Sequence, residues 1–127
     1  MAAWNEAALT ALDDGDELDI EIARTDGTRH DPVIIWGVRV GTDFYVRSAR
    51  GPEGLWYRRA LRTFAGTLSA RGVVQDVSFE QVSASDPVNA DIDATYHRKY
   101  DRYGAAIVGA VVGPSAALVT LRATPVD

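Results

Sequence analysis

The sequence contains no cysteine, which excludes a disulfide framework, a thiolate nucleophile and a zinc–thiolate site. It has only two histidines, and neither His30 nor His97 has a second histidine at metal-ligand spacing. We therefore predict no metal site. There is also no Ser-His-Asp ordering and no glycine-rich phosphate loop of a known type, so the catalytic residues stay unassigned. Any chemistry must come from other side chains or from a cofactor.

Long apolar runs are missing as well, and none approaches the roughly 20 residues that a membrane-spanning helix requires. The N-terminal segment MAAWNEAALTALDDGDE has no basic residue before its apolar part, unlike a secretory signal. We therefore expect a cytoplasmic protein that does not bind membranes. The formal net charge of −5 argues against a general nucleic-acid binder, and no nucleic-acid partner is expected.

The length of 127 residues and the hydrophobic content of 46% are typical of one ordinary domain. We expect a single domain at 1–127. It would hold an N-terminal helix at 1–16, strands one to five at 17–82, a helix at 86–104 and a final strand at 115–125.

Alternating and continuous apolar patterns predict the strands. LDIEI at 18–22 alternates apolar and acidic residues, which indicates a half-buried strand. PVIIWGVRV at 32–40 is apolar on both faces, so we expect one strand that is covered on two sides. Turn residues at 41–43 and 71–72 predict two hairpins. A homodimer that covers the outer face of the 32–40 strand is a reasonable expectation.

Aromatic residues form one stripe on the late helix, and its role is left open. Packing is the expected role, and the alternative is that one hydroxyl serves as a proton donor to a substrate. The stripe comprises Val88, Ile92, Tyr96, Tyr100 and Tyr103.

Cations gather in the segment YVRSARGPEGLWYRRALR at 45–62, although the chain as a whole is acidic. Arginine holds phosphate through two parallel charge-assisted hydrogen bonds, and a serine hydroxyl and loop amides add neutral donors. The other interpretation is a solvated face whose arginines pair with surface carboxylates. Arg47 stands out because it lies inside a predicted strand, where a charge needs a partner. The arginines are Arg47, Arg50, Arg58, Arg59 and Arg62.

The tryptophans offer flat surfaces on which a planar ring can stack. Trp36 lies in an apolar strand, where a core position is the more common outcome. The pair Trp56 and Tyr57 follows a glycine-containing loop, so it is the better candidate for ligand contact.

Two segments, RTDGTR and PVIIWGVRVGTDFYVRSARGPEGLWYRRAL, carry a family resemblance. The chain resembles the flavin-binding split-barrel superfamily, which includes pyridoxamine-phosphate oxidases and deazaflavin-dependent nitroreductases, and it looks closest to an uncharacterised branch. The resemblance extends from about Glu17 to the final strand. The matching motif positions are Arg24, Thr25, Gly27, Arg29, Ser48, Gly51, Trp56 and Tyr57.

The pattern of six strands, mostly in hairpins, with one helix at the front and one before the last strand implies a mainly β fold with two helices, in which a small antiparallel sheet curls into a barrel. The resemblance implies that this six-stranded barrel is a split β-barrel. It also implies a homodimer that holds FMN or the deazaflavin coenzyme and transfers hydride to a small planar substrate. By similarity, phosphate would bind near Arg47, Ser48, Arg50 and Arg58, the ring near Trp56 or Tyr57, and the reduced ring's negative charge near the Gly51 amides.

Two departures from the family pattern motivate an alternative. Lysines common among the relatives' phosphate ligands are absent from this region, and the N-terminal segment is short. The alternative is a split-barrel protein without a cofactor, which binds or transforms a small anionic metabolite without redox chemistry.

Overall fold

The computed structural model describes residues 3–126, so the ends of the expected 1–127 domain and the start of the expected 1–16 helix lie outside the described residues. The described part holds seven strands and five α-helices, which corrects the prediction of six strands and two helices. The strands are β1 (Leu18–Ile22), β2 (Val33–Ile35), β3 (Gly37–Val40), β4 (Asp43–Arg47), β5 (Ala65–Ala70), β6 (Val73–Gln81) and β7 (Thr120–Pro125). The helices are α1 (Glu6–Asp14), α2 (Leu55–Thr63), α3 (Val88–Tyr100), α4 (Ala105–Val108) and α5 (Pro114–Ala117), with 3₁₀ turns at Gly51–Glu53 and Asp101–Tyr103.

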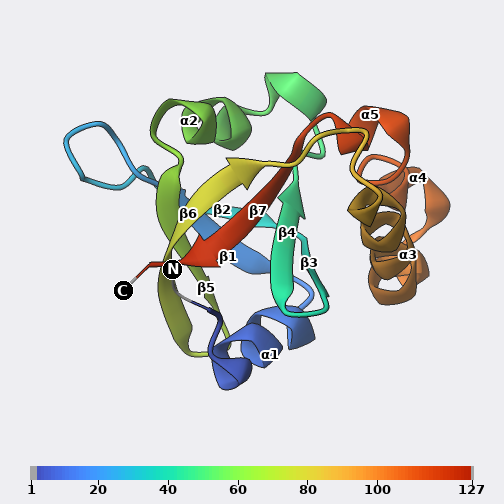
Figure 1. The fold of residues 1–127 in the computed structure, drawn as a ribbon, viewed down its shortest axis with the longest axis horizontal. Coiled ribbons are helices and arrows are strands. Elements are labelled where there is room, and N and C mark those ends of the chain that lie inside the picture. The colour runs from blue at the N-terminus through green and yellow to red at the C-terminus, as the bar shows by residue number, and fades with distance from the viewer. Residues whose placement is uncertain (1–2, 127) are drawn as a thin grey trace.

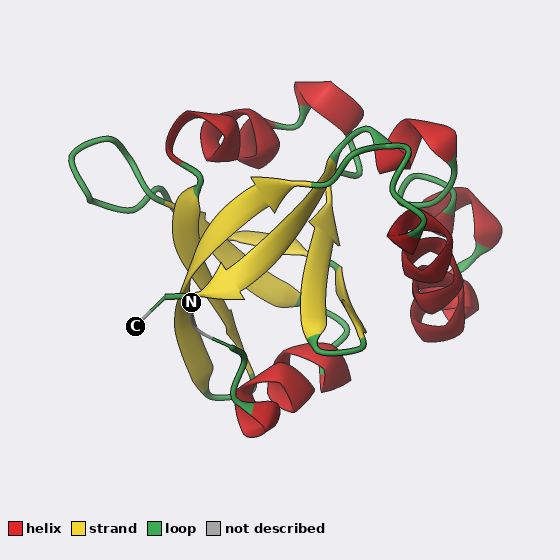
Figure 2. Cartoon of the chain, viewed as in Figure 1, coloured by secondary structure: helices red, strands yellow, loops and turns green. Residues whose placement is uncertain are grey.

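The strands form one antiparallel sheet in the order β2-β1-β5-β6-β7-β4-β3, which curls into a half-barrel (Figure 1, Figure 2). The segment predicted as one strand at 32–40 is in fact two strands, because the run breaks at Trp36. β2 pairs with β1 at one edge of the sheet and β3 pairs with β4 at the other. The single apolar run at 32–40 thus supplies both edge strands of the sheet, β2 and β3, and this is why the sheet has seven strands instead of the predicted six.

Gly37 begins β3 at a point where a side chain has no room. A Cβ atom at this position would lie 2.6 Å from the ring of Phe44 on the paired strand. The backbone of Gly37 thus approaches the Phe44 ring closely at the point where the apolar run at 32–40 breaks into two strands.

Both predicted hairpins are present. β3 and β4 pair through a turn that contains Gly41 at φ 61°, and β5 and β6 pair through Arg71 and Gly72, both with positive φ. These turns favour glycine because its backbone adopts positive φ without steric cost.

The main core lies inside the curled sheet and is closed by α1 and α2, which lie at opposite ends of the half-barrel (Figure 1). Leu9 and Leu12 of α1 are fully buried, as is Ala60 of α2. Asn5 caps α1 by accepting hydrogen bonds from the amides of Ala7 and Ala8.

A second core lies between α3 and the outer surface of β3 and β4. Ile92, Tyr96 and Tyr100 are buried there beside Val38 and Tyr45. The aromatic stripe of the late helix therefore packs against the sheet, apart from Tyr103, which is 43% exposed.

Two short helices, α4 and α5, were not predicted: α4 lies in a stretch to which the sequence pattern assigned no structure, and α5 overlaps the start of the strand predicted at 115–125. The helices α3, α4 and α5 lie together beside β3 and β4 (Figure 1). Because α5 ends at Ala117, the final strand starts at Thr120 and not at 115. No helix among residues 3–126 is long and apolar enough to cross a membrane.

Candidate functional site

The loop at 48–54 connects β4 to α2 and has little freedom. The Ser48 hydroxyl donates a hydrogen bond to the carbonyl oxygen of Gly51 at 2.7 Å. Gly51 has φ 64°, a conformation that favours glycine. Gly54 packs against the same hydroxyl, since a Cβ atom at this position would lie 2.2 Å from the Ser48 Oγ. These contacts fix the path of the loop into the first turn of α2.

A cavity of about 500 Å³ lies between this loop, β2, the start of α2 and the α4 segment. We call it the apolar pocket. Most of its wall is aliphatic or aromatic, with one acid and a group of polar residues from the end of β4. Its lining residues are Glu17, Val33, Ile34, Ile35, Trp36, Arg47, Ser48, Ala49, Arg50, Gly54, Leu55, Trp56, Ile107 and Val111.

Two tryptophans contribute to the wall of the apolar pocket. Trp36 is half-buried, and one of its faces stacks on Tyr100 with ring centroids 4.1 Å apart and an interplanar angle of 8°. Trp56 is 7% exposed and meets Tyr57 edge to face, with centroids 6.1 Å apart. Tyr57 itself belongs to the main core. The pocket therefore presents parts of two fixed aromatic surfaces.

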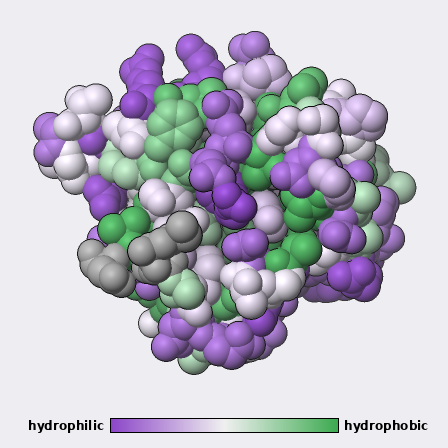
Figure 3. Space-filling view, viewed as in Figure 1, coloured by the Kyte–Doolittle hydropathy of each residue, from purple (hydrophilic) through white to green (hydrophobic). Residues whose placement is uncertain are grey.

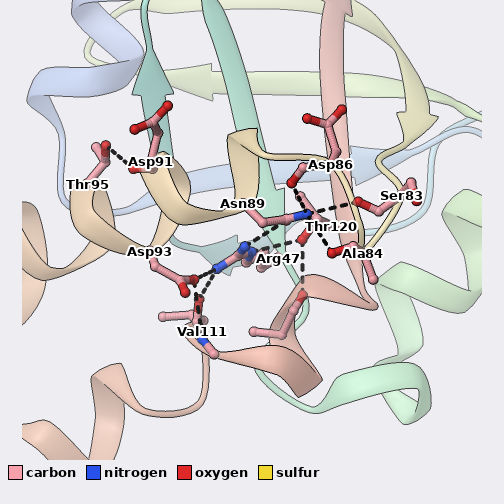
Figure 4. Close-up of polar contacts among 12 residues, drawn as sticks. Arg47, Ser83, Ala84, Asp86, Asn89, Asp91, Asp93, Thr95, Val111 and Thr120 are labelled. Carbon is pink, nitrogen blue, oxygen red and sulfur yellow. Dashed lines mark hydrogen bonds and ion pairs between the residues drawn. The ribbon is translucent and has the colours of Figure 1, made fainter.

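Arg47 borders the same pocket, yet its guanidinium group is fully buried and engaged within the chain (Figure 4). Its Nε donates to Thr120 Oγ1 at 2.8 Å, and Nη2 donates to Asn89 Oδ1 at 3.0 Å. Nη1 donates to the carbonyl oxygen of Val111 at 2.9 Å and forms an ion pair with Asp93. Because a guanidinium group has five N–H donors, little hydrogen-bonding capacity is left for a ligand.

The Arg47 network also connects separate elements. Asp93 of α3 accepts a hydrogen bond from the amide of Gly113 at 3.2 Å, so β4, α3, β7 and the segment between α4 and α5 meet at one point (Figure 4). Val111 from this segment lines the apolar pocket. Arg47 therefore holds one wall of the pocket in position.

A second cavity, of about 420 Å³, lies on the other side of Leu55, between the β1–β2 loop and α2. We call it the arginine pocket. Figure 3 shows hydrophilic side chains that project along the edge of the molecule where Figure 1 places α2. The lining residues are Ala23, Arg24, Thr25, His30, Leu55, Arg58, Arg59, Arg62 and Thr63.

The lining of the arginine pocket contains four arginines and no acidic residue. The pKa of His30 is lowered by its partial burial and by the charges of Arg59, Arg24 and Arg62, against the opposing effect of Asp31. The positive field thus favours neutral His30. Within residues 3–126, no group of three or more His, Asp and Glu side chains lies close enough to hold a metal ion.

The structure divides the predicted site residues between different places. Arg47, Ser48, Arg50 and Trp56 line the apolar pocket, whereas Arg58 lines the arginine pocket. Gly51 lies in the loop beside the apolar pocket without lining it, and Tyr57 is buried in the main core.

Other lining residues were not predicted from the sequence. Ile107 and Val111 reach the apolar pocket from a stretch that shows no clear periodicity, and no local signal points to them. Arg24 and Thr25 do have a signal, because they belong to the RTDGTR segment that carries the family resemblance.

A family model described as "Uncharacterized protein conserved in bacteria (DUF2255)" matches residues 8–123 of the chain. A comparison with curated protein sequences found no match.

Solved structures similar to this chain share its fold at low sequence identity. HutZ, the heme storage protein from Vibrio cholerae, is 11% identical with a TM-score of 0.69, and the match covers 96% of this chain and 90% of that one. A putative pyridoxamine 5′-phosphate oxidase from Listeria innocua is 12% identical with a TM-score of 0.65, covering 96% and 93%. An F420 reductase is 18% identical with a TM-score of 0.63, covering 98% and 97%. The predicted resemblance to the split-barrel superfamily is confirmed, and at these identities it concerns the fold.

Proposed function

Since the chain belongs to the DUF2255 family of bacterial proteins and has the split-barrel fold, we propose that it binds a flavin or deazaflavin in the apolar pocket and transfers hydride to a small planar substrate. The observation that carries this proposal is the pocket itself. It combines fixed aromatic surfaces with a loop that has free hydrogen-bond donors.

The size and lining of the apolar pocket suit a planar heteroaromatic ring. Ligand sites commonly have volumes of about 300–1,000 Å³ and apolar walls with a few polar groups. This pocket has a volume of about 500 Å³ and includes Ile35, Trp36 and Trp56 in its wall. An aromatic face accepts another flat ring without requiring hydrogen bonds.

The 48–51 loop supplies donors for an anionic end of the ligand. The backbone amides of Ala49 and Arg50 donate to no acceptor among residues 3–126. The Arg50 side chain is exposed and forms no ion pair with any residue in that range. Two amides and one guanidinium group beside Gly51 match the needs of a phosphate group.

In this proposal Arg50 and the loop amides bind phosphate, whereas Ser48 supports the loop, because its hydroxyl hydrogen is already donated to Gly51. Phosphate contact by Arg47 stays a prediction, and its buried network favours a role in holding the pocket wall. A bound flavin or deazaflavin supplies the hydride-transfer chemistry. The residues of the chain bind and orient the ring and exclude water from it.

We propose further that the protein is a homodimer whose interface lies beside the apolar pocket. Ile34 is 62% exposed, and Leu55 and Ile107 are each 56% exposed, although all three line this pocket. A neighbouring copy that covers them would bury apolar area and close the pocket against water.

A titration with riboflavin, FMN and the deazaflavin coenzyme, followed by flavin fluorescence, tests cofactor binding. Ile107→Glu should abolish saturable binding, because it places a charge in the pocket wall. Leu118→Glu is the matched control, since Leu118 is 68% exposed and does not line the pocket. Turnover with candidate electron acceptors then tests hydride transfer.

Absence of binding by all three compounds would contradict the cofactor proposal. The alternative function, binding of a small anionic metabolite without redox chemistry, is supported by the same free amides and Arg50. It predicts thermal stabilisation of the protein by such an anion, which is lost in Arg50→Ala and kept in Arg71→Ala.

A further inference from the structure

We propose that the arginine pocket is a second binding site, which takes a ligand group with two or more negative charges, such as a pyrophosphate. This site goes beyond the proposed flavin site, from which Leu55 separates it. Its charge, its geometry and the pairing of arginines elsewhere in the chain all support the proposal.

The first argument is the distribution of paired arginines. Most arginines outside this pocket have a carboxylate partner, namely Arg29 with Asp76, Arg39 with Glu6, Arg47 with Asp93, Arg102 with Asp16 and Arg122 with Glu80. Within residues 3–126, Arg24, Arg58, Arg59 and Arg62 form no ion pair. The chain has 18 Asp and Glu residues. Acidic residues are therefore common in the chain, and their absence from this pocket reflects where they lie in the fold.

The second argument is the geometry of α2. Leu55, Arg58, Arg59 and Arg62 follow the i, i+3, i+4, i+7 spacing and share one helix face, whereas Trp56, Tyr57 and Ala60 are buried on the other. Like charges one turn apart destabilise an isolated helix. A bound anion would turn this repulsion into attraction.

The third argument is the concave shape of the site. The β1–β2 loop brings Arg24, Thr25 and His30 to face the arginines of α2 across a cavity of about 420 Å³. Arg24 is held in place by hydrogen bonds to Thr28 Oγ1 at 3.2 Å and to the carbonyl oxygen of Arg29 at 2.7 Å. Guanidinium groups on two sides of a cavity can hold several anionic oxygens at once, which a flat solvated surface does not.

Two kinds of ligand could bring a multiply charged anionic group to the arginine pocket. The anion can be part of a cofactor whose ring occupies the apolar pocket, because Leu55 borders both cavities. It can also be a separate metabolite. Riboflavin has no anionic group and tests the apolar pocket alone, whereas inorganic pyrophosphate has no ring and tests the arginine pocket alone. The proposed flavin site and the proposed anion site can therefore fail independently, and the two ligands show which of them has failed.

The decisive experiment follows both histidines by NMR while pyrophosphate is added. An anion in the arginine pocket opposes the positive field there, so the pKa of His30 should rise and its ring signals should shift. His97 is the internal control, because it lies on α3 beside Asp101 at 2.8 Å and outside the pocket. Saturation is expected at millimolar pyrophosphate or below, at low salt.

Calorimetry on two charge-matched double variants completes the test. Arg58→Ala with Arg62→Ala removes two exposed pocket arginines and should weaken pyrophosphate binding at least about tenfold. Arg71→Ala with Arg98→Ala removes two exposed arginines outside the pocket and should change it less than about twofold. Equal losses in both variants, or equal shifts of both histidines, overturn the proposal, as does absence of binding.

Competition then identifies the source of the anion. If FMN or the deazaflavin coenzyme displaces pyrophosphate while riboflavin does not, the arginine pocket, in place of the 48–51 loop, receives the anionic part of the cofactor. If pyrophosphate binds together with all three, the pocket serves a separate metabolite. Both outcomes support the arginine pocket as an anion site.

Discussion

A buried guanidinium group is stable only where its charge and its N–H donors are satisfied, and Arg47 meets both conditions inside the chain. The sequence indicated that a charge within a strand needs a partner. It did not indicate which partners, because Asn89, Asp93 and Thr120 lie far away along the chain. The arginine with the strongest sequence-based case for phosphate binding is thus the one most engaged in the fold.

We expect Arg47→Ala to lower the free energy of unfolding by about 3–5 kcal/mol, because it leaves Asp93 without its cation and buried acceptors without donors. Urea denaturation followed by circular dichroism measures the change. Arg71→Ala, at an exposed hairpin position, should stay within about 0.5 kcal/mol. Wild-type stability in Arg47→Ala, together with lost phosphate affinity, would instead favour the ligand role.

The contact between Gly54 and Ser48 gives a second prediction at the residue scale. Gly54→Ala should destabilise the protein by about 1–3 kcal/mol, because the new Cβ atom would overlap the Ser48 hydroxyl. In a Ser48→Ala background the same change should cost clearly less, since the overlapping atom is gone. A double-mutant cycle measured by urea denaturation determines this coupling. Additive effects would show that the two residues do not interact.

At the scale of elements, local patterns predicted the hairpins because these depend on neighbouring residues. The division of the 32–40 run between two edges of the sheet does not depend on local pattern. It reflects the curl of the whole sheet and the packing of Gly37 against Phe44. The apolar pocket depends on this division, since Trp36 stands where the run breaks.

The aromatic stripe of α3 offers a matched pair of substitutions. The Tyr100 hydroxyl donates to the carbonyl oxygen of Asp16 at 2.6 Å and accepts from the amide of Gly37 at 3.2 Å. The Tyr96 hydroxyl is buried and has no hydrogen-bond partner within the described part of the chain. Both side chains are otherwise fully buried in the same cluster.

We therefore expect Tyr100→Phe to cost about 1–2 kcal/mol, because it leaves a buried amide without its acceptor. Tyr96→Phe should be neutral or stabilising by up to about 1 kcal/mol, because it removes an unsatisfied hydroxyl. Thermal and urea unfolding of the two variants provide the comparison. A large loss of stability in Tyr96→Phe would indicate a partner for this hydroxyl, such as an internal water.

At the scale of the whole molecule, composition and pattern predicted an antiparallel barrel, and the family resemblance predicted the split-barrel superfamily. The pockets were less accessible to prediction. The sequence singled out the 45–62 segment as one site, whereas the structure divides its side chains between two cavities and the core. That division depends on which cavity each face of α2 points toward. Predicting it requires the position of α2 on the barrel.

The exposed apolar residues beside the apolar pocket lead to a prediction about assembly. If a second copy covers them, the wild-type protein should have twice the mass of one chain in analytical ultracentrifugation at micromolar concentration. Ile34→Glu should shift this equilibrium toward the monomer and weaken riboflavin binding, because it charges the interface and opens the pocket. Val74→Glu is the matched control, since Val74 is 73% exposed on β6, does not line the pocket and should leave both properties unchanged. A wild-type protein that stays monomeric while it binds riboflavin would separate the two properties and place the whole ligand site within one chain.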